Sequence, residues 1–145
     1  MKRIVLAFAA LVVSVGLFAQ EATVKKPENL VKFKENVHDF GKIQQGVPVT
    51  YEFAFQNITD KPVVIESATA SCGCTTPVKP EAPIAKGKSD KITAGFNAAA
   101  AGQFNKTIYV KVAGIDQPME LRITGEVLNK EEYVKYEKEK GTKKG

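Results

Sequence analysis

The chain has 145 residues, of which 26% are charged, with a formal net charge of +5, two cysteines and no tryptophan. Two cysteines are too few for a small fold held together by several disulfides, and a chain of this length can bury a core of its own. The excess of positive charge is mild and forms no arginine-rich stripe interleaved with aromatic residues, so the composition argues against nucleic-acid binding.

Residues 1–19 have the layout of a secretory signal peptide. A positive start at Lys2 and Arg3 is followed by an uncharged, mostly apolar run from Ile4 to Ala19. The run is shorter than the roughly 20 residues of a membrane-spanning helix, although a retained membrane anchor is the alternative. Cleavage after Ala19 removes two of the five net positive charges and no acid. We therefore expect an exported protein, periplasmic or secreted, with no transmembrane segment after signal cleavage.

The pattern of residues 30–128 is that of an all-β domain. Leu30–Phe33 and Val37–Phe40 begin it, and the stretch from Gly41 to Pro48 has the glycine and proline content of a turn between two strands. Val49–Asn57 is the clearest strand, because apolar and polar side chains alternate along it with a period of two.

The second half of this domain repeats the pattern. A β-branched run from Pro62 to Ser67 predicts a strand, and the stretch from Thr76 to Lys88 contains three prolines and should be a loop or at best an edge. Alternation returns at Asp90–Asn97, Phe104–Ala113 and Met119–Val127, and a run of alanines connects the first two of these segments.

Together these segments predict an antiparallel β-sandwich of about seven short strands. No Cys…Trp…Cys spacing is present, so an antibody-type domain is excluded. Ten inward-facing side chains should form the core, namely Tyr51, Phe53, Phe55, Ile65, Ile92, Phe96, Ile108, Val110, Leu121 and Ile123.

Residues 129–145 form a charged tail. Asn129 and Glu132 have the spacing of a capping box, and Tyr133 and Tyr136 fall on one face of a helix. We expect a short, frayed helix with a solvated Lys/Gly end, and a tail that binds a partner is the alternative.

Both cysteines lie in the segment Ser71–Thr75, after a predicted strand. In a straight strand the side chains of Cys72 and Cys74 share a face, with Cα atoms about 6.6–6.8 Å apart. That is the upper edge of the disulfide range, and Gly73 could bend the chain to shorten the distance. Three interpretations remain open: a disulfide or a structural pair, a redox-active pair, or a site for a soft metal ion such as Cu(I).

His38 is a further candidate metal ligand, beside Asp39. A structural zinc site needs four ligands, so His38, Cys72 and Cys74 would require carboxylates or a second chain. The sequence contains no activated-serine, phosphate-loop or zinc-protease motif, and pairing Cys74 with His38 as in papain is a poor fit. We therefore predict no catalytic residues, no bound cofactor and no enzymatic activity.

The chain closely resembles the bacterial domain of unknown function 1573 (DUF1573) family, from about Val37 to Val127. The resemblance rests on the segments His38–Ile43, Gly46, Phe53–Asn57, Val64–Ile65, Ala70–Thr75, Pro83–Gly87, Phe96–Asn97, Gly102–Ile108 and Leu121–Val127. The family is common in secreted proteins of Bacteroidetes-type bacteria, and its fold is similar to immunoglobulin-like domains of ciliary and centrosomal scaffold proteins. Ala85–Gly87 departs from the family's usual Pro-Gly, which affects a loop.

The resemblance implies an immunoglobulin-like sandwich and supplies no activity or catalytic residues. The first hypothesis is an exported, non-enzymatic interaction or envelope-associated module whose partner is unknown. The second is a periplasmic protein that handles thiols or copper through Cys72 and Cys74.

Overall fold

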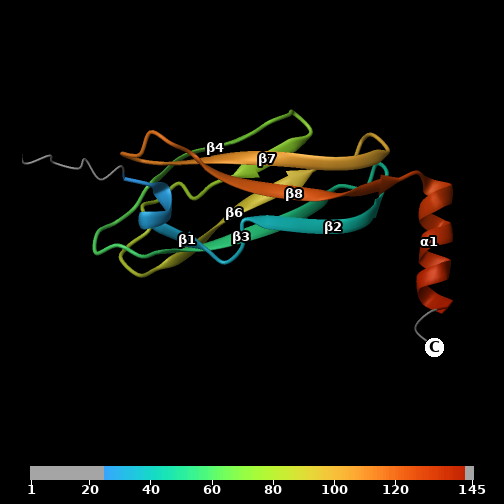
Figure 1. Cartoon of the computed structure of the whole chain (residues 1–145), viewed down its shortest axis with the longest axis horizontal. Helices are drawn as coiled ribbons and strands as arrows, with labels where there is room; N and C mark the ends of the chain where they lie inside the picture. The colour runs from blue at the N-terminus through green and yellow to red at the C-terminus, as the bar shows by residue number, and fades with distance from the viewer. Residues whose placement is uncertain (1–24, 143–145) are drawn as a thin grey trace, which may run out of the picture.

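The protein consists of two four-stranded β-sheets packed face to face, with one helix at the C-terminal end (Figure 1). The computed structural model describes residues 25–142. Sheet A contains, in spatial order, β1 (Val31–Phe33), β3 (Val49–Asn57), β6 (Ser89–Phe96) and β5 (Thr75–Val78). Sheet B contains β2 (Val37–Gln44), β8 (Met119–Leu128), β7 (Gly102–Val112) and β4 (Ile65–Ala70). A short 3-10 helix, η1 (Pro27–Asn29), precedes the strands, and α1 (Lys130–Thr142) follows them.

The predicted immunoglobulin-like β-sandwich is confirmed, with one strand more than the sequence indicated. The additional strand is β5, which lies in the proline-rich stretch that we expected to be a loop or at best an edge. It occupies the edge of sheet A, where it pairs only with β6. An edge position tolerates Pro77, since a proline has no N–H to donate to a neighbouring strand.

One strand pair departs from the antiparallel expectation. β2 runs parallel to β8, with Val37 beside Arg122 and Gln44 beside Leu128, whereas the other paired strands are antiparallel. β1 and β2 follow one another along the chain, and the short link at residues 34–36 carries the chain from sheet A to sheet B. β2 therefore keeps the direction of β1 while it joins the edge of the other sheet.

The predicted turn between Gly41 and Gly46 was placed too early. β2 continues to Gln44, and the turn follows it, with the Val47 N–H donating to the Gln44 carbonyl at 3.2 Å. Gly41 has a φ of 65° and lies where the register of β2 shifts, and its N–H donates to the Asp39 carboxylate at 2.8 Å. A glycine with positive φ here makes a bulge within the strand and does not end it.

The predicted core is confirmed at every position except Tyr51. Tyr51 is only partly buried, because its ring stacks on His38 with centroids 3.5 Å apart and its hydroxyl donates to Glu35. The other predicted core residues are buried between the sheets, namely Phe53, Phe55, Ile65, Ile92, Phe96, Ile108, Val110, Leu121 and Ile123.

Helix α1 begins with the predicted capping box. Asn129 Oδ1 accepts a hydrogen bond from the Glu132 N–H at 3.0 Å, and Glu132 Oε2 accepts one from the Asn129 N–H at 3.2 Å. No residue of α1 is buried, and the Lys42 ammonium lies 5.2 Å from the centroid of the Tyr136 ring. Figure 1 shows α1 projecting from the end of the sandwich where β8 stops, across the direction of the strands.

Two predictions concern residues that the structure does not describe. The signal peptide at residues 1–19 and the end of the tail at residues 143–145 lie outside the described range. Within residues 25–142, no helix is long and apolar enough to cross a membrane.

Candidate functional site

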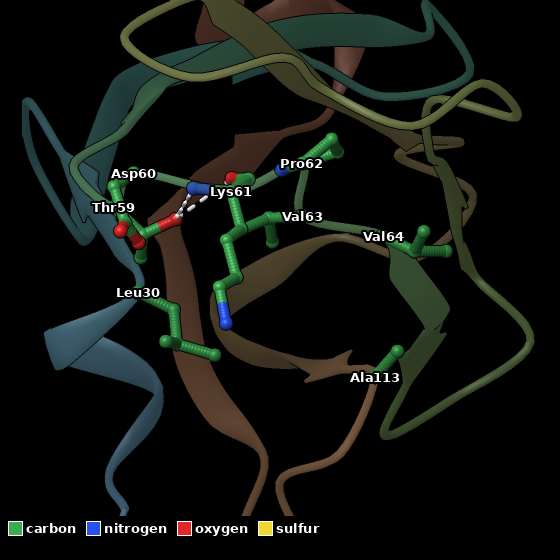
Figure 2. Close-up of a pocket in the computed structure, with 8 residues that line it drawn as sticks. All are labelled: Leu30, Thr59, Asp60, Lys61, Pro62, Val63, Val64 and Ala113. Carbon is green, nitrogen blue, oxygen red and sulfur yellow. Dashed lines mark hydrogen bonds between the residues drawn. The ribbon is translucent and has the colours of Figure 1, made fainter.

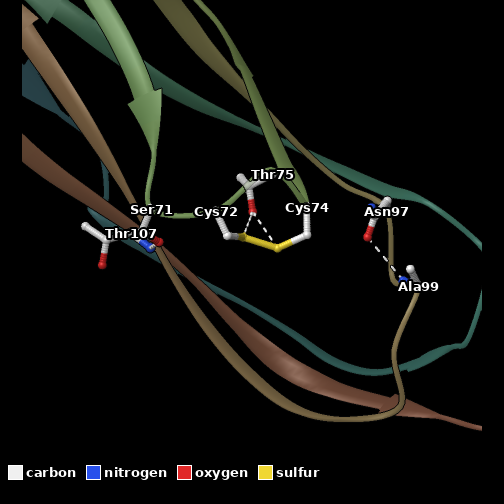
Figure 3. Close-up of a disulfide and its surroundings, with 7 residues drawn as sticks. All are labelled: Ser71, Cys72, Cys74, Thr75, Asn97, Ala99 and Thr107. Carbon is white, nitrogen blue, oxygen red and sulfur yellow. Dashed lines mark hydrogen bonds between the residues drawn. A yellow bond between two sulfur atoms is a disulfide. The ribbon is translucent and has the colours of Figure 1, made fainter.

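Cys72 and Cys74 lie at the turn where the chain leaves sheet B and enters sheet A. Their sulfur atoms are at disulfide distance, and Figure 3 shows the bond at the end of β4. The Cα atoms are 5.4 Å apart, which is shorter than a straight strand allows and close to the usual disulfide spacing. Both side chains are partly buried. The segment is therefore a tight reversal, with β4 on one side and β5 on the other.

Backbone hydrogen bonds hold this reversal to both sheets. The Ser71 N–H donates to the Thr107 carbonyl of sheet B at 2.9 Å, and the Thr107 N–H donates to the Ser71 hydroxyl at 3.3 Å. The Asn97 N–H, just after β6 of sheet A, donates to the Cys74 carbonyl at 3.0 Å. These hydrogen bonds, together with the disulfide, hold the turn and its two sulfur atoms in place.

Gly73 has a smaller role than its sequence position suggests. It is not among the glycines with positive φ, and a Cβ atom built on it would meet nothing within 4 Å. The bend that brings the two Cα atoms together therefore does not require glycine, in contrast to the sequence-based interpretation.

We expect Gly73→Ala to keep the Cys72–Cys74 disulfide and to change the free energy of unfolding by less than about 0.5 kcal/mol, as an exposed substitution without a clash should. Urea unfolding and alkylation of free thiols measure the two quantities. A reduced pair, or a loss of more than about 1 kcal/mol, would show that the turn needs glycine after all.

The hydroxyl of Thr75 points at both sulfur atoms. Thr75 Oγ1 lies 3.8 Å from Cys72 Sγ and 4.0 Å from Cys74 Sγ, as the dashed lines in Figure 3 show. Thr75 is only 3% exposed, one of two buried polar residues of the described chain. In the described range, no other hydrogen-bond partner of this hydroxyl is found. A sulfur in a disulfide is a weak acceptor, so this buried hydroxyl is poorly satisfied in the oxidised state.

Two hollows flank Cys74. The first, of about 190 Å³, lies between Cys74 and the start of β7 and includes Lys106 in its wall. The second, of about 220 Å³, lies over sheet A between Thr50, Thr76 and Gly95. Lys106 is two residues from the buried Phe104 and two from the buried Ile108. Because every second residue of a strand faces the same way, its side chain starts on the inner face of β7. Lys106 is partly buried and lines the first hollow together with Cys74.

Three stretches without any charged residue converge at this end of the sandwich. Residues 43–51, 67–78 and 92–105 contain no Asp, Glu, Lys, Arg or His, although 26% of the chain is charged. The Gly46 N–H donates to the Ala98 carbonyl at 2.9 Å, and the Gln45 side-chain amide donates to the Ala99 carbonyl at 3.0 Å. We call the three loops at residues 45–48, 71–74 and 97–101 the uncharged end.

The uncharged end exposes small apolar side chains on a constrained backbone. Val47 is 48% exposed, and Pro48 and the alanines at 99–101 are exposed as well. Ala98, with a φ of 50°, is the only non-glycine residue with positive φ in the described range. Backbone strain of this kind is often found at binding sites.

His38 is not close to the cysteines. It lies on β2, at the opposite edge of sheet B from β4, which is three strand spacings away or on the order of 14 Å. Its Nδ1 is 3.9 Å from Glu35, and its ring stacks on Tyr51. Within residues 25–142, no group of three or more His, Cys, Asp and Glu side chains could hold a metal ion. The predicted metal candidates are thus divided between two distant sites.

The other end of the sandwich has a larger hollow of about 410 Å³. Figure 2 shows the side chain of Lys61 extending across it, with Leu30 and Ala113 on opposite sides. The Thr59 hydroxyl donates to the Lys61 carbonyl at 2.8 Å, which keeps the loop turned over the hollow. The charged residues Asp60 and Lys61 line this hollow, in contrast to the three loops of the uncharged end.

Residues 31–127 match the family model described as "Protein of unknown function (DUF1573)". The chain belongs to this family. The match covers most of the sandwich and confirms the resemblance found in the sequence. No curated protein sequence matches the chain significantly.

Solved structures resemble the chain in fold. An immunoglobulin-like protein domain, the ASH / PapD-like domain 7 of human CEP192, has a TM-score of 0.57 at 10% identity over 87% of this chain and 99% of that one. A protein of unknown function from Porphyromonas gingivalis W83 has a TM-score of 0.59 at 14% identity, over 68% and 46% of the two chains. The secreted serine protease VesC from Vibrio cholerae has a TM-score of 0.56 at 12% identity, over 70% and 24%. Identities this low show the fold alone, and the chain matches less than half of the last two proteins.

The sequence-based interpretation found the cysteines and missed their surroundings. The uncharged stretches are visible in the sequence, but their convergence depends on which strand ends meet. Thr75 attracts no notice in a sequence, because its importance comes from burial against the two sulfur atoms.

Proposed function

We propose that this protein is an exported, non-enzymatic interaction module of the bacterial envelope that binds a protein partner through its uncharged end. The signal-peptide layout of residues 1–19 supports export. Membership of the DUF1573 family and the likeness to an ASH / PapD-like domain support a binding module more than an enzyme. The serine protease VesC shares only the fold, at 12% identity.

The observation that carries this proposal is the absence of charge from three adjoining loops of a chain that is charged elsewhere. Charged residues are depleted at the centre of protein–protein interfaces, because each would have to lose its hydration on binding. Three loops joined by hydrogen bonds present Val47, Pro48 and Ala99 without large rearrangement. A surface already fixed in place loses little conformational entropy when it binds.

A protein fits this surface better than a lipid bilayer. Proteins that insert into the membrane interface use tryptophan, tyrosine or leucine with lysine or arginine beside them. The exposed apolar side chains at the uncharged end are three alanines, one valine and one proline, and the exposed polar ones are Gln45, Ser71 and Asn97. Charged residues occur next to this end on α1, which starts immediately after β8, and they would form a polar rim around an apolar centre.

The sheet edges are poorly suited to binding by strand addition. β1 has three residues, β5 contains Pro77, and β2 and β4 each have a register shift in the pairing with their inner neighbours, β8 and β7. Short, bulged and proline-containing strands are the features by which natural proteins protect sheet edges from added strands. Binding through the loops of the uncharged end is therefore the better supported mode.

We expect Ala100→Glu to reduce partner binding at least about tenfold, because a carboxylate in the centre of an apolar contact stays unpaired. The matched control is Ala82→Glu, which makes the same change at an exposed position in the loop before β6. Intact cells of the producing bacterium are treated with an amine-reactive cross-linker, and α1 supplies lysines at the rim. The yield of cross-linked adduct is then measured by immunoblot of the envelope fraction.

Both variants should be exported and folded to the same level as the parent protein. Equal adduct yields from Ala100→Glu and the parent protein would contradict the proposal. So would loss of the adduct in Ala82→Glu alone, since that result would place the partner on another surface.

A further inference from the structure

We propose that the Cys72–Cys74 disulfide is a thiol–disulfide exchange site whose substrate is a protein or small-molecule dithiol. The disulfide lies in one of the three loops of the uncharged end, but its chemistry needs only the two sulfur atoms and the groups around them, so it can be tested without the docking partner. Both cysteines are only partly buried at a surface turn, so Cys72 keeps part of its surface exposed, although the hollows of this turn lie beside Cys74. A reacting thiol can therefore approach a sulfur atom without unfolding of the sandwich.

The disulfide contributes little to the fold. It closes a ring across only one intervening residue, and the stabilisation that chain entropy gives to a disulfide is smallest for the shortest loops. The turn is also held by hydrogen bonds to Thr107 and Asn97. We expect the reduced protein to remain folded, so the oxidised and reduced forms can interconvert as two folded states.

Thr75 favours breaking of the bond. Its buried hydroxyl lies 3.8 and 4.0 Å from the two sulfur atoms, at the long end of the range for a sulfur acceptor. A thiolate is a much stronger acceptor than a disulfide sulfur, so the same hydroxyl gains a charge-assisted hydrogen bond when the bond breaks. A stabilised thiolate leaves faster in exchange.

Lys106 makes the two sulfur atoms unequal. It is the one charged residue in the wall of the hollow beside Cys74, and Cys72 does not line that hollow. A lysine that starts on the inner face of a strand must extend to reach solvent, and Lys106 does so from the wall of the hollow that Cys74 also lines. Its ammonium group stabilises negative charge on Cys74 more than on Cys72, which makes Cys74 the leaving group.

The reaction consists of two exchange steps. A thiolate of the dithiol attacks Cys72 Sγ, the disulfide breaks, and its electron pair goes to Cys74, which leaves as the thiolate. The second thiol of the substrate, as a thiolate, attacks the sulfur of the first in the mixed disulfide and releases the Cys72 thiolate. The two protons of the dithiol end on Cys72 and Cys74. The protein disulfide is reduced by two electrons, and the dithiol is oxidised to a disulfide.

The test compares Thr75→Val with Thr76→Val in the purified full-length mature protein. Valine has nearly the shape of threonine, and the Thr76 side chain lies over Gly95. The oxidised proteins are mixed with dithiothreitol in the absence of denaturant, and freed thiols are alkylated and counted by mass. We expect Thr75→Val to slow reduction about tenfold, the size of one lost charge-assisted hydrogen bond, and Thr76→Val to change it less than twofold.

Thr75→Ser tests the role of the hydroxyl if valine disturbs the fold. It should restore the parental rate, because it keeps the hydroxyl and loses only a methyl group. With glutathione in place of dithiothreitol, fragmentation mass spectrometry should find the mixed disulfide on Cys72. The proposal is overturned if Thr75→Val reacts at the parental rate, if Thr75→Ser is as slow as Thr75→Val, if glutathione is found on Cys74, or if reduction requires a urea concentration that unfolds the protein.

Discussion

Replacing Asn57 with alanine should lower the free energy of unfolding by about 3–4 kcal/mol. Asn57 is fully buried at the end of β3, and its side-chain amide donates to the carbonyls of Lys61 at 2.7 Å and Ile84 at 2.9 Å. Its Oδ1 accepts from the N–H of Thr59 at 2.8 Å. Alanine would leave several of these groups without a partner where water cannot reach all of them, and each such group costs about 1–3 kcal/mol.

Urea unfolding of Asn57→Ala measures this loss directly. Asn105→Ala is the matched control, because Asn105 is exposed on β7 and should change stability by less than about 0.5 kcal/mol. A loss below about 1 kcal/mol for Asn57→Ala would mean that the loop at residues 58–63 does not depend on the buried amide.

Replacing Gly125 with alanine should cost about 3 kcal/mol, from a clash and from backbone strain together. A Cβ atom on Gly125 would lie 2.7 Å from the Phe104 ring and 2.8 Å from the Gly41 carbonyl oxygen. The residue also has a φ of 154°, which L-amino acids rarely adopt. The ring of Phe104 stacks on Phe96, with centroids 4.2 Å apart, so it cannot move away without disturbing the core.

The cost of the clash can be separated from the cost of the backbone conformation. Gly114 has a φ of 80°, and a Cβ atom on it would meet nothing within 4 Å, so Gly114→Ala should cost only about 1 kcal/mol. Thermal and urea unfolding of the two variants should differ clearly. Equal losses would show that Phe104 and the Gly41 region move aside without penalty, contrary to the close approach of β2 to β8.

Much of the fold can be predicted from the sequence, because single-strand patterns determine which face is buried. The alternation in β3 places Phe53 and Phe55 in the core without knowledge of any neighbour. Asn129 and Glu132 likewise identify the start of α1, since a capping box involves only nearby residues. Local signals are sufficient where the interaction itself is local.

The predictions that were wrong concern relations between distant strands. Glycine at position 41 indicated a turn, but the partner strand β8 allows it to be a bulge. The parallel direction of β2 and β8 depends on the change of sheet between β1 and β2, which no periodicity reveals.

Sequence-based prediction of the candidate site was limited for the same reason. Cys72 and Cys74 attract attention by their number and spacing, but the sequence could not decide among a disulfide, a redox pair and a metal site. Thr75 lies close to both sulfur atoms, and Lys106 lines the hollow beside Cys74. Lys106 comes from β7, which is far from the cysteines along the chain, so the sequence does not show that they are near each other.

The most direct test of the docking surface is a scan with a photo-reactive amino acid in the living bacterium. It is placed singly at Val47 and Ala100 on the uncharged end, and at Ala82 and Ala113 elsewhere, all exposed positions. After irradiation, adducts are resolved by mass. We predict the same protein adduct from Val47 and Ala100, and none from Ala82 or Ala113. A lipid adduct at Val47 and Ala100, or a protein adduct only at Ala82 and Ala113, would contradict the proposal.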